Sequence, residues 1–175
     1  MQPNVTILPF TLDYLTPVAE FLNMGWRTTY AGILDAHFLD GLTTQTREDI
    51  LRQKLARGMS GLMAHDKDGA LIGFTLLGPT HLEVLGQAGE VNMLYVRPDI
   101  IGTGLGHLLM TQAEATLIAD GYTAIGLDVF TPNTRAIKFY ERHGYTKVGT
   151  KFDNIEGKIY ELDIMLKQVV DASVA

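Results

Sequence analysis

Three glycines at alternate positions, Gly102, Gly104 and Gly106, separate an apolar run from an amphipathic stretch. The run over residues 91–96 suits a buried strand, and the apolar residues after the glycines recur at the three- and four-residue spacing of a helix. Glycines let a backbone approach a ligand closely, and the first N–H groups of a helix lack intrahelical partners. A strand, a glycine loop and a helix in this order predict a cradle for a diphosphate. A turn whose glycines only cap the helix is the alternative.

The composition favours a single globular domain over residues 1–175, with residues 170–175 as a frayed tail. Hydrophobic residues make up 46% of the chain and charged residues 19%, which allows a sizeable core. The net charge of −6 makes nucleic acid and anionic membranes unexpected partners, and no stretch has the length of a membrane span.

The residue types that usually bind metals are sparse. The chain has no cysteine, which excludes disulfides, thiolate metal ligands and a cysteine acyl-enzyme, and which makes the cytoplasm the expected location. The five histidines are scattered without the spacing of a zinc pair, so we expect no metal.

Hydrophobic periodicity and turn residues predict an alternation of strands and helices. The expected elements are a strand over 5–9, a helix from 11 to about 30, a loop or short helical turn over 33–42, a helix over 43–58, hairpin strands over 61–65 and 70–78, a loop over 81–89, a strand over 91–96, a helix over 105–117, a strand over 124–130, a helix over 133–142, and strands over 145–150 and 158–166.

Two strand relationships follow from this order. The strands over 91–96 and 124–130 are joined by a helix, so they should be parallel with a right-handed crossover. The last strand alternates between apolar and acidic residues, which predicts a closing antiparallel hairpin with Glu161 and Asp163 on the face opposite the apolar side chains.

The glycine loop does not fit two well-known nucleotide-binding loops. A P-loop requires Lys followed by Ser or Thr after its last glycine, and neither pair follows here. The dinucleotide fingerprint requires the spacing G-x-G-x-x-G directly after a strand, whereas this chain has G-x-G-x-G with residues 97–101 in between. A dinucleotide-binding oxidoreductase domain is therefore disfavoured.

A second candidate motif begins at Asn133 and ends at Tyr140. Residues seven apart return to nearly the same helix face, roughly 10 Å along the axis, so both side chains can contact one extended ligand. Asn offers a donor and an acceptor that suit an amide-containing chain, and Tyr offers a phenol. Taken singly, Asn133 is an ordinary helix N-cap and Tyr140 an ordinary aromatic packing residue.

Together these motifs resemble those of a known family. The sequence Leu94-Tyr95-Val96-Arg97-Pro98, the glycine stretch 102–106, Asn133 and the stretch 136–145 are similar to the GNAT superfamily of acyl-CoA-dependent N-acetyltransferases. The resemblance implies a single-domain α/β (α+β) fold, with a mixed, mostly antiparallel twisted sheet of six to seven strands, about four helices and a β-loop-α-β acyl-CoA-binding core. One residue departs from the family signature, which places Arg or Gln where this chain has Ile101.

The resemblance also implies how acetyl-CoA would bind. The backbone of Leu94 and Val96 would contact the thioester and the pantetheine arm, Asn133 would contact the pantetheine, and Tyr140 would lie near the thioester sulfur. The diphosphate would be held by the loop residues Ile101, Gly102, Thr103, Gly104, Leu105, Gly106 and His107. Because Ile101 replaces a polar side chain, diphosphate binding should rest more on backbone N–H groups, with help from His107.

The implied chemistry is the attack of a neutral amine on a thioester. A Lys-like amine with a pKa of about 10.4 is protonated at neutral pH, so a carboxylate must remove a proton directly or through water. Glu90 is the candidate base, with Glu83 as the second choice, and a solvated charge at the strand end is the alternative for both. Tyr140 is the candidate acid for the leaving thiolate. Tyr30 and Trp26 are candidate walls of the acceptor pocket, although core packing is the alternative, particularly for Trp26.

The sequence therefore predicts an N-acetyltransferase that moves acetyl from acetyl-CoA to a primary amine in a ternary complex, because no cysteine is present for a covalent route. A small acceptor such as a polyamine, an amino acid or an amine antibiotic is favoured over a protein. A catalytically silent acyl-CoA-binding sensor is the alternative from another class, supported by Ile101. The assembly state is open, with a homodimer among the alternatives.

Overall fold

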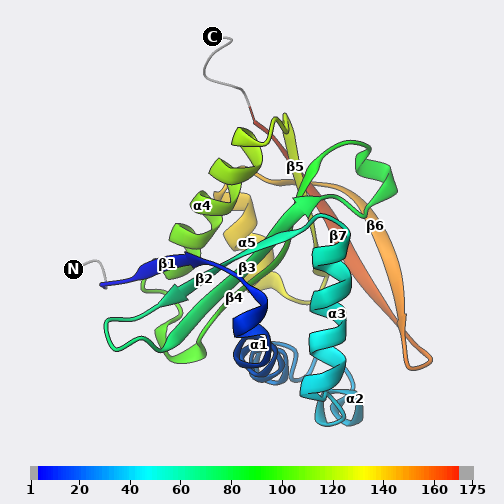
Figure 1. The fold of residues 1–175 in the computed structure, drawn as a ribbon. Coiled ribbons are helices and arrows are strands. Elements are labelled where there is room, and N and C mark those ends of the chain that lie inside the picture. Colours follow the sequence, from blue (N-terminus) through cyan, green and yellow to red (C-terminus); the bar gives the residue numbers. More distant parts are fainter. Residues whose placement is uncertain (1–3, 170–175) are drawn as a thin grey trace.

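A seven-stranded sheet runs through the computed structural model, which describes residues 4–169 (Figure 1). The strand order is β1-β2-β3-β4-β5-β7-β6. The strands are β1 (Thr6–Pro9), β2 (Ser60–His65), β3 (Leu71–Pro79), β4 (Gly89–Val96), β5 (Ala124–Phe130), β6 (Thr146–Ile155) and β7 (Lys158–Gln168). Neighbouring strands are antiparallel except β4 and β5, which are parallel. The predicted mixed, mostly antiparallel sheet is confirmed.

Five α-helices accompany the sheet within the described residues, one more than the sequence indicated. They are α1 (Leu15–Thr29), α2 (Ala36–Asp40), α3 (Thr44–Ala56), α4 (Leu105–Ala119) and α5 (Thr134–Arg142). Side chains cap three of them: Asp35 for α2, Thr43 for α3 and Asn133 for α5 each accept a backbone N–H of the first turn. Within residues 4–169, none of the helices has the length and apolar character needed to cross a membrane.

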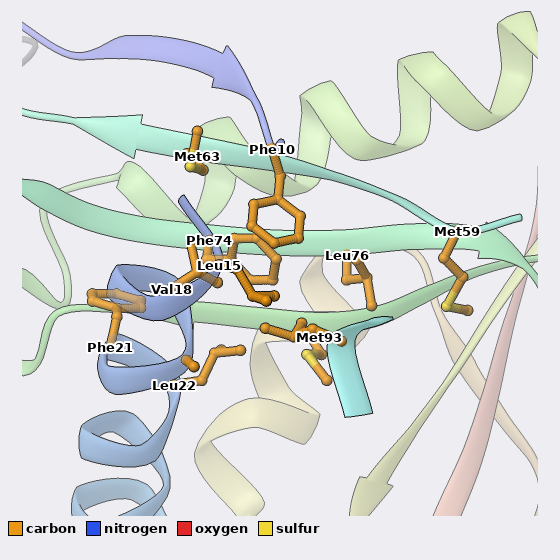
Figure 2. Close-up of a cluster of buried hydrophobic side chains, with 12 residues drawn as sticks. Phe10, Leu15, Val18, Phe21, Leu22, Met59, Met63, Phe74, Leu76 and Met93 are labelled. Carbon is orange, nitrogen blue, oxygen red and sulfur yellow. The ribbon is translucent and has the colours of Figure 1, made fainter. Parts of the chain in front are cut away.

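One face of the sheet is covered by α1, which packs against α3. Phe74 and Leu76 point from β3 into a cluster with Val18 and Leu22 of α1 (Figure 2). The rings of Phe10 and Phe74 meet edge to face with centroids 5.3 Å apart. Burial of each such apolar side chain contributes about 1.5–3 kcal/mol, so this cluster fixes α1 and α3 against β2, β3 and β4.

The opposite face is covered by α4 and α5. Leu105 and Leu109 of α4 pack on Ile72 and Ala64, and a Cβ added to Gly73 would lie 2.7 Å from a methyl group of Leu109. Glycine at this position therefore lets α4 approach the sheet closely. The close approach fixes where α4 begins and hence where the glycine loop lies.

The parallel contact between β4 and β5 is short. Its register covers two pairs, Gly89 with Ile125 and Glu90 with Gly126. A bulge interrupts the pairing of β4 with β3 at Asn92, because Leu76 pairs with Met93 and Leu77 with Val91. Residues 93–96 of β4 stay paired with β3 but have no partner on β5, so the sheet opens between β4 and β5 along this stretch.

Asp163 lies on the face of β7 opposite Leu162 and Ile164, as the alternation predicted, but that face is buried at this position. Asp163 is 6% exposed and accepts hydrogen bonds from Lys147 Nζ at 2.7 Å and Thr131 Oγ1 at 2.8 Å. The strand alternation was read correctly for the apolar side chains Leu162 and Ile164, but Met165 on the other side is also buried. Both faces of central β7 are covered, which a two-state apolar–acidic pattern does not reveal. The predicted frayed tail lies outside the described residues.

Asp163 makes the stability of the fold pH-dependent. Burial alone would raise the pKa of its carboxyl, but hydrogen bonds from Lys147 and Thr131 outweigh burial and lower that pKa. The Asp163 carboxylate therefore stabilises the folded protein above its pKa in the unfolded chain, about 3.9. This stabilisation is lost as the pH falls through the lower pKa of the folded protein. We expect Asp163→Asn to reduce the free energy of unfolding by about 1.5–3 kcal/mol at pH 7 and by much less near pH 2. Urea unfolding at both pH values measures this, and an equal loss at both would contradict it.

Candidate active site

A cavity of about 850 Å³ lies where β4 and β5 diverge. Its lining comes from α1, α3, β4, the glycine loop, β5 and α5. The predicted site residues that line it are Trp26, Tyr30, Leu94, Val96, Ile101, Gly102, Gly104, Gly106, His107, Asn133 and Tyr140. The divergence of the strands thus brings together most residues that the sequence selected.

Glu83, the second-choice base, is outside this lining, and so are three further predicted residues. The Thr103 hydroxyl donates to the Ile100 carbonyl at 2.7 Å, and the Leu105 side chain is 2% exposed within the α4 core. The buried Leu105 side chain is therefore not available to a ligand, which leaves its backbone N–H group. The third, Glu90, is 0% exposed, so the alternative of a solvated strand-end charge is wrong for it.

The glycine loop leads directly into the first turn of α4. Gly102 and Gly104 have φ values of +91° and +94°, a region that residues with a Cβ rarely adopt. The helical hydrogen bonds begin with the Leu108 N–H, which donates to the Gly104 carbonyl at 3.0 Å. The N–H groups of Gly106 and His107 precede that bond and point out of the helix end, so the loop can bind an anion.

Two histidines supplement the loop on its α5 side. His107 Nδ1 lies 3.2 Å from His143 Nε2, and both rings line the cavity. Burial lowers the pKa of His143, with the neighbouring His107 acting in the same direction. A bound anion would oppose that effect by favouring a proton on His143. The histidines therefore offer donors close to Ile101, where the sequence lacks a polar side chain.

Asn133 and Tyr140 both face the cavity from α5. Asn133 Oδ1 accepts the Ala136 N–H at 3.3 Å, so Asn133 is the N-cap and a wall residue at once. Burial raises the pKa of the Tyr140 phenol, and the neighbouring Tyr30 and Asp128 raise it further. The phenol therefore keeps its proton across the neutral range, as a proton donor requires.

An aromatic group closes the cavity on the α1 side. The rings of Trp26 and Tyr30 stack edge to face at 4.9 Å, and Tyr30 meets Phe130 of β5 at 5.1 Å. The Tyr30 and Tyr95 hydroxyls are 2.8 Å apart, and burial raises the pKa of Tyr95 to about 12. These phenols remain neutral, so the aromatic side chains themselves carry no charge at neutral pH.

Glu90 contacts the cavity through His81. Its carboxylate accepts hydrogen bonds from the Thr80 hydroxyl, the Asn92 amide and the His81 backbone N–H, and His81 Nδ1 lies 2.8 Å from Oε2. Burial alone would raise the pKa of Glu90, but the hydrogen bonds from His81 and Asn92 outweigh it and lower that pKa. An ionised Glu90 accepts the proton of Nδ1, which leaves His81 Nε2 as the basic ring atom. His81 lines the cavity.

Sequence reasoning missed several charged wall residues. Asp128 of β5 lies 3.9 Å from His81 Nε2 and 2.6 Å from Lys151 Nζ. Arg47 and Lys54 of α3 also line the cavity. Their seven-residue spacing, with Ile50 between them on the same helix face, was the signal available in the sequence.

Comparison with known proteins identifies the family. The family described as Acetyltransferase (GNAT) family matches residues 26–145. An uncharacterised N-acetyltransferase of Bacillus subtilis, YuaI, is 27% identical over 87% of this chain and 85% of its own length. The spermidine N(1)-acetyltransferase of Thermoplasma acidophilum is 25% identical over 90% of this chain and 99% of its own length.

The fold agrees with this relationship. The crystal structure of PaiA N-acetyltransferase from Thermoplasma acidophilum, in complex with coenzyme A, superposes with a TM-score of 0.71 at 23% identity. The superposition covers 94% of this chain and 98% of the other. The resemblance seen in the glycine and Asn–Tyr motifs is confirmed: the chain belongs to the acetyltransferase (GNAT) family and is an acetyl-CoA-dependent acyltransferase.

Proposed function

We propose that this enzyme transfers the acetyl group of acetyl-CoA to the primary amine of a small molecule, by direct attack in a ternary complex. One observation carries the proposal: a single cavity joins the glycine loop, the Tyr140 phenol and the His81 imidazole. Its volume of about 850 Å³ lies in the range of small-ligand sites, which favours a small acceptor. The similarity to a spermidine acetyltransferase supports an acceptor of this size.

The residues present fit acetyl-CoA. A Cβ added to Gly102 or Gly104 would meet no atom within 4 Å, so the loop backbone is open to a ligand. We propose that this loop binds the diphosphate with help from His107, that the backbone of Leu94 and Val96 binds the arm, and that Asn133 binds an amide of it. Acetyl-CoA supplies the acyl group as an activated thioester.

For the proton transfer we propose that Glu90 acts through His81 rather than on the amine itself. Glu90 is enclosed by its hydrogen-bond donors, whereas the His81 ring is part of the cavity wall. Glu90 orients the ring and stabilises the imidazolium that forms when Nε2 accepts the amine proton. Tyr140 then donates its proton to the departing thiolate.

His81→Asn tests the imidazole base. The asparagine amide can replace Nδ1–H toward Glu90 but has no basic nitrogen. We expect kcat to fall about 100-fold at pH 7, and the deficit to shrink toward pH 10 because the fraction of neutral amine rises about tenfold per pH unit. A pH profile of kcat measures this. His37→Asn on α2, outside the cavity, is the matched control, and a deficit that does not change with pH would contradict the base role.

The proposed function itself is tested with a panel of amines, with release of the CoA thiol as the readout. Turnover of at least one small amine supports the proposal. Tight acetyl-CoA binding without turnover of any small amine or peptide supports the alternative of a silent acyl-CoA sensor. Turnover of peptide N-termini alone supports a protein acetyltransferase. The assembly state stays open, with a homodimer among the alternatives, and sedimentation velocity would decide between them.

A further inference from the structure

The strongest unexplained charge in the molecule is Arg47. Arg47 is 4% exposed, yet it lines the cavity. Nε donates to Asn23 Oδ1 at 2.9 Å, and the guanidinium carbon lies 4.5 Å from the centre of the Trp26 ring. These contacts fix the guanidinium in position and satisfy one of its five N–H donors. They do not neutralise its charge.

The neighbours of Arg47 leave its charge uncompensated. Among residues 4–169, no carboxylate lies within 4.0 Å of its guanidinium. Burial lowers its pKa, and the two groups that oppose this effect are the phenols of Tyr95 and Tyr30. Both phenols have raised pKa values and are neutral in the physiological range. A buried guanidinium without a counter-ion is costly, so the site is built for an anion that the protein itself does not supply.

Lys54 extends this positive wall two helical turns further along α3. It is partly buried, lines the same cavity, and burial lowers its pKa while Glu90 and Asp128 act in the opposite direction. Neither carboxylate lies within 4.0 Å of its ammonium group. Ile50 lies between the two cations on the same helix face and also lines the cavity.

The carboxylates of the cavity are already engaged by other groups. Lys151 Nζ lies 2.6 Å from Asp128 and 3.3 Å from Asp153, and Glu90 is held by His81 and Asn92. On the acceptor side of the cavity, the carboxylates are thus already paired, whereas Arg47 and Lys54 have no carboxylate partner in the described part of the chain. This arrangement favours an anionic group and disfavours a polycation.

We propose that the acceptor is a small amine bearing a carboxylate, and that Arg47 and Lys54 bind this carboxylate while the amine faces His81. The inference rests on the proposed function and narrows its substrate class. Arg47 presents a planar fork of donors beside an aromatic face, the arrangement that binds carboxylates well, and Lys54 adds a second charge. Lys54 is near Glu90, at the other end of β4 from the glycine loop, so the diphosphate does not compete for Lys54.

The test compares each acid with its own carboxamide. The panel holds glycine, β-alanine, 4-aminobutyrate and the L-amino acids, each paired with its carboxamide, together with spermidine. We expect kcat/KM to be about tenfold or more higher for the best acid than for its amide. Intrinsic reactivity acts the other way, because replacing the carboxylate by an amide lowers the amine pKa and enriches the neutral amine. A preference for the acid is therefore a property of the protein.

Variants assign the preference to residues. Lys54→Met should remove most of the preference, and Arg52→Met on the exposed side of α3 should retain it. Arg47→Met should act in the same direction, with thermal unfolding used to confirm that the variant is folded. Turnover of amines with no preference for acids, or with spermidine as the best acceptor, overturns the inference and leaves the proposed function intact.

A binding measurement separates the two proposals. Acids and amides are titrated calorimetrically into the protein saturated with CoA. If no amine is acetylated but acids bind more tightly than amides, and Lys54→Met abolishes the difference, the proposed function fails and the carboxylate subsite stands. Equal binding of acids and amides overturns the subsite regardless of turnover.

Discussion

Replacing Gly104 by aspartate should abolish acetyl-CoA binding, with an increase in Kd of at least about 100-fold. Gly104 is the N-cap of α4 and has a φ of +94°, and a Cβ there would enter open space within the diphosphate cradle. Aspartate would place a negative charge where the diphosphate must lie and would compete for the N–H groups at the helix end. Isothermal titration with acetyl-CoA measures the change.

Two further variants separate charge from backbone strain. Gly69→Asp changes a glycine of φ +81°, also with open space around its Cβ, in the turn between β2 and β3, outside the cavity. It should cost a similar amount of stability, about 1–2 kcal/mol, without changing Kd. Gly104→Ala shares the strain but lacks the charge, and should weaken binding less than aspartate. Tight binding by Gly104→Asp would refute the cradle assignment.

Replacing Tyr140 by phenylalanine should lower kcat about 100-fold or more while leaving the Kd of acetyl-CoA within about twofold. The change removes only the hydroxyl, and the ring keeps its packing against Phe139 at 5.4 Å between centroids. Without the phenolic proton the thiolate must leave uncompensated, so the loss should appear in the chemical step. Single-turnover kinetics together with equilibrium titration measure the two quantities.

Tyr145→Phe is the matched control for this variant. The Tyr145 ring lies 6.2 Å from that of Tyr140, but its hydroxyl donates to Glu114 at 3.0 Å and it does not line the cavity. Its loss should cost about 1 kcal/mol of stability and leave kcat nearly unchanged. Unchanged turnover in Tyr140→Phe would remove Tyr140 as the acid and leave protonation of the thiolate to solvent.

The fold was largely predictable because its signals are local. Apolar periodicity located α1 and α4, capping residues and the placement of charges located α3, and the strand–loop–helix order predicted the parallel β4–β5 pair. That the glycine loop and α5 border one cavity was predictable for the same reason, since each carries its selected residues within one short segment.

The acceptor side depends on tertiary contacts that no short segment contains. The burial of Glu90 follows from the segment before β4, which folds back so that Thr80 and His81 donate to its carboxylate. That segment had no periodicity and was predicted as a loop, so His81 was missed. The sequence analysis did not single out Arg47, because only the packing of α3 against α1 buries it beside Trp26.

Because the β4–β5 pairing is short, binding of the co-substrate should stabilise the sheet. Beyond Glu90, every second residue of β4 directs its N–H and C=O groups into the cavity, so this stretch is an edge strand enclosed within the protein. An arm with its own amides that lies along this edge adds a strand between the half-sheets β1–β4 and β5–β7–β6. The bound co-substrate would then connect β4 and β5 where they share only two residue pairs, and so stabilise the sheet. Saturation at 100 times its Kd would add about 2.7 kcal/mol to the free energy of unfolding.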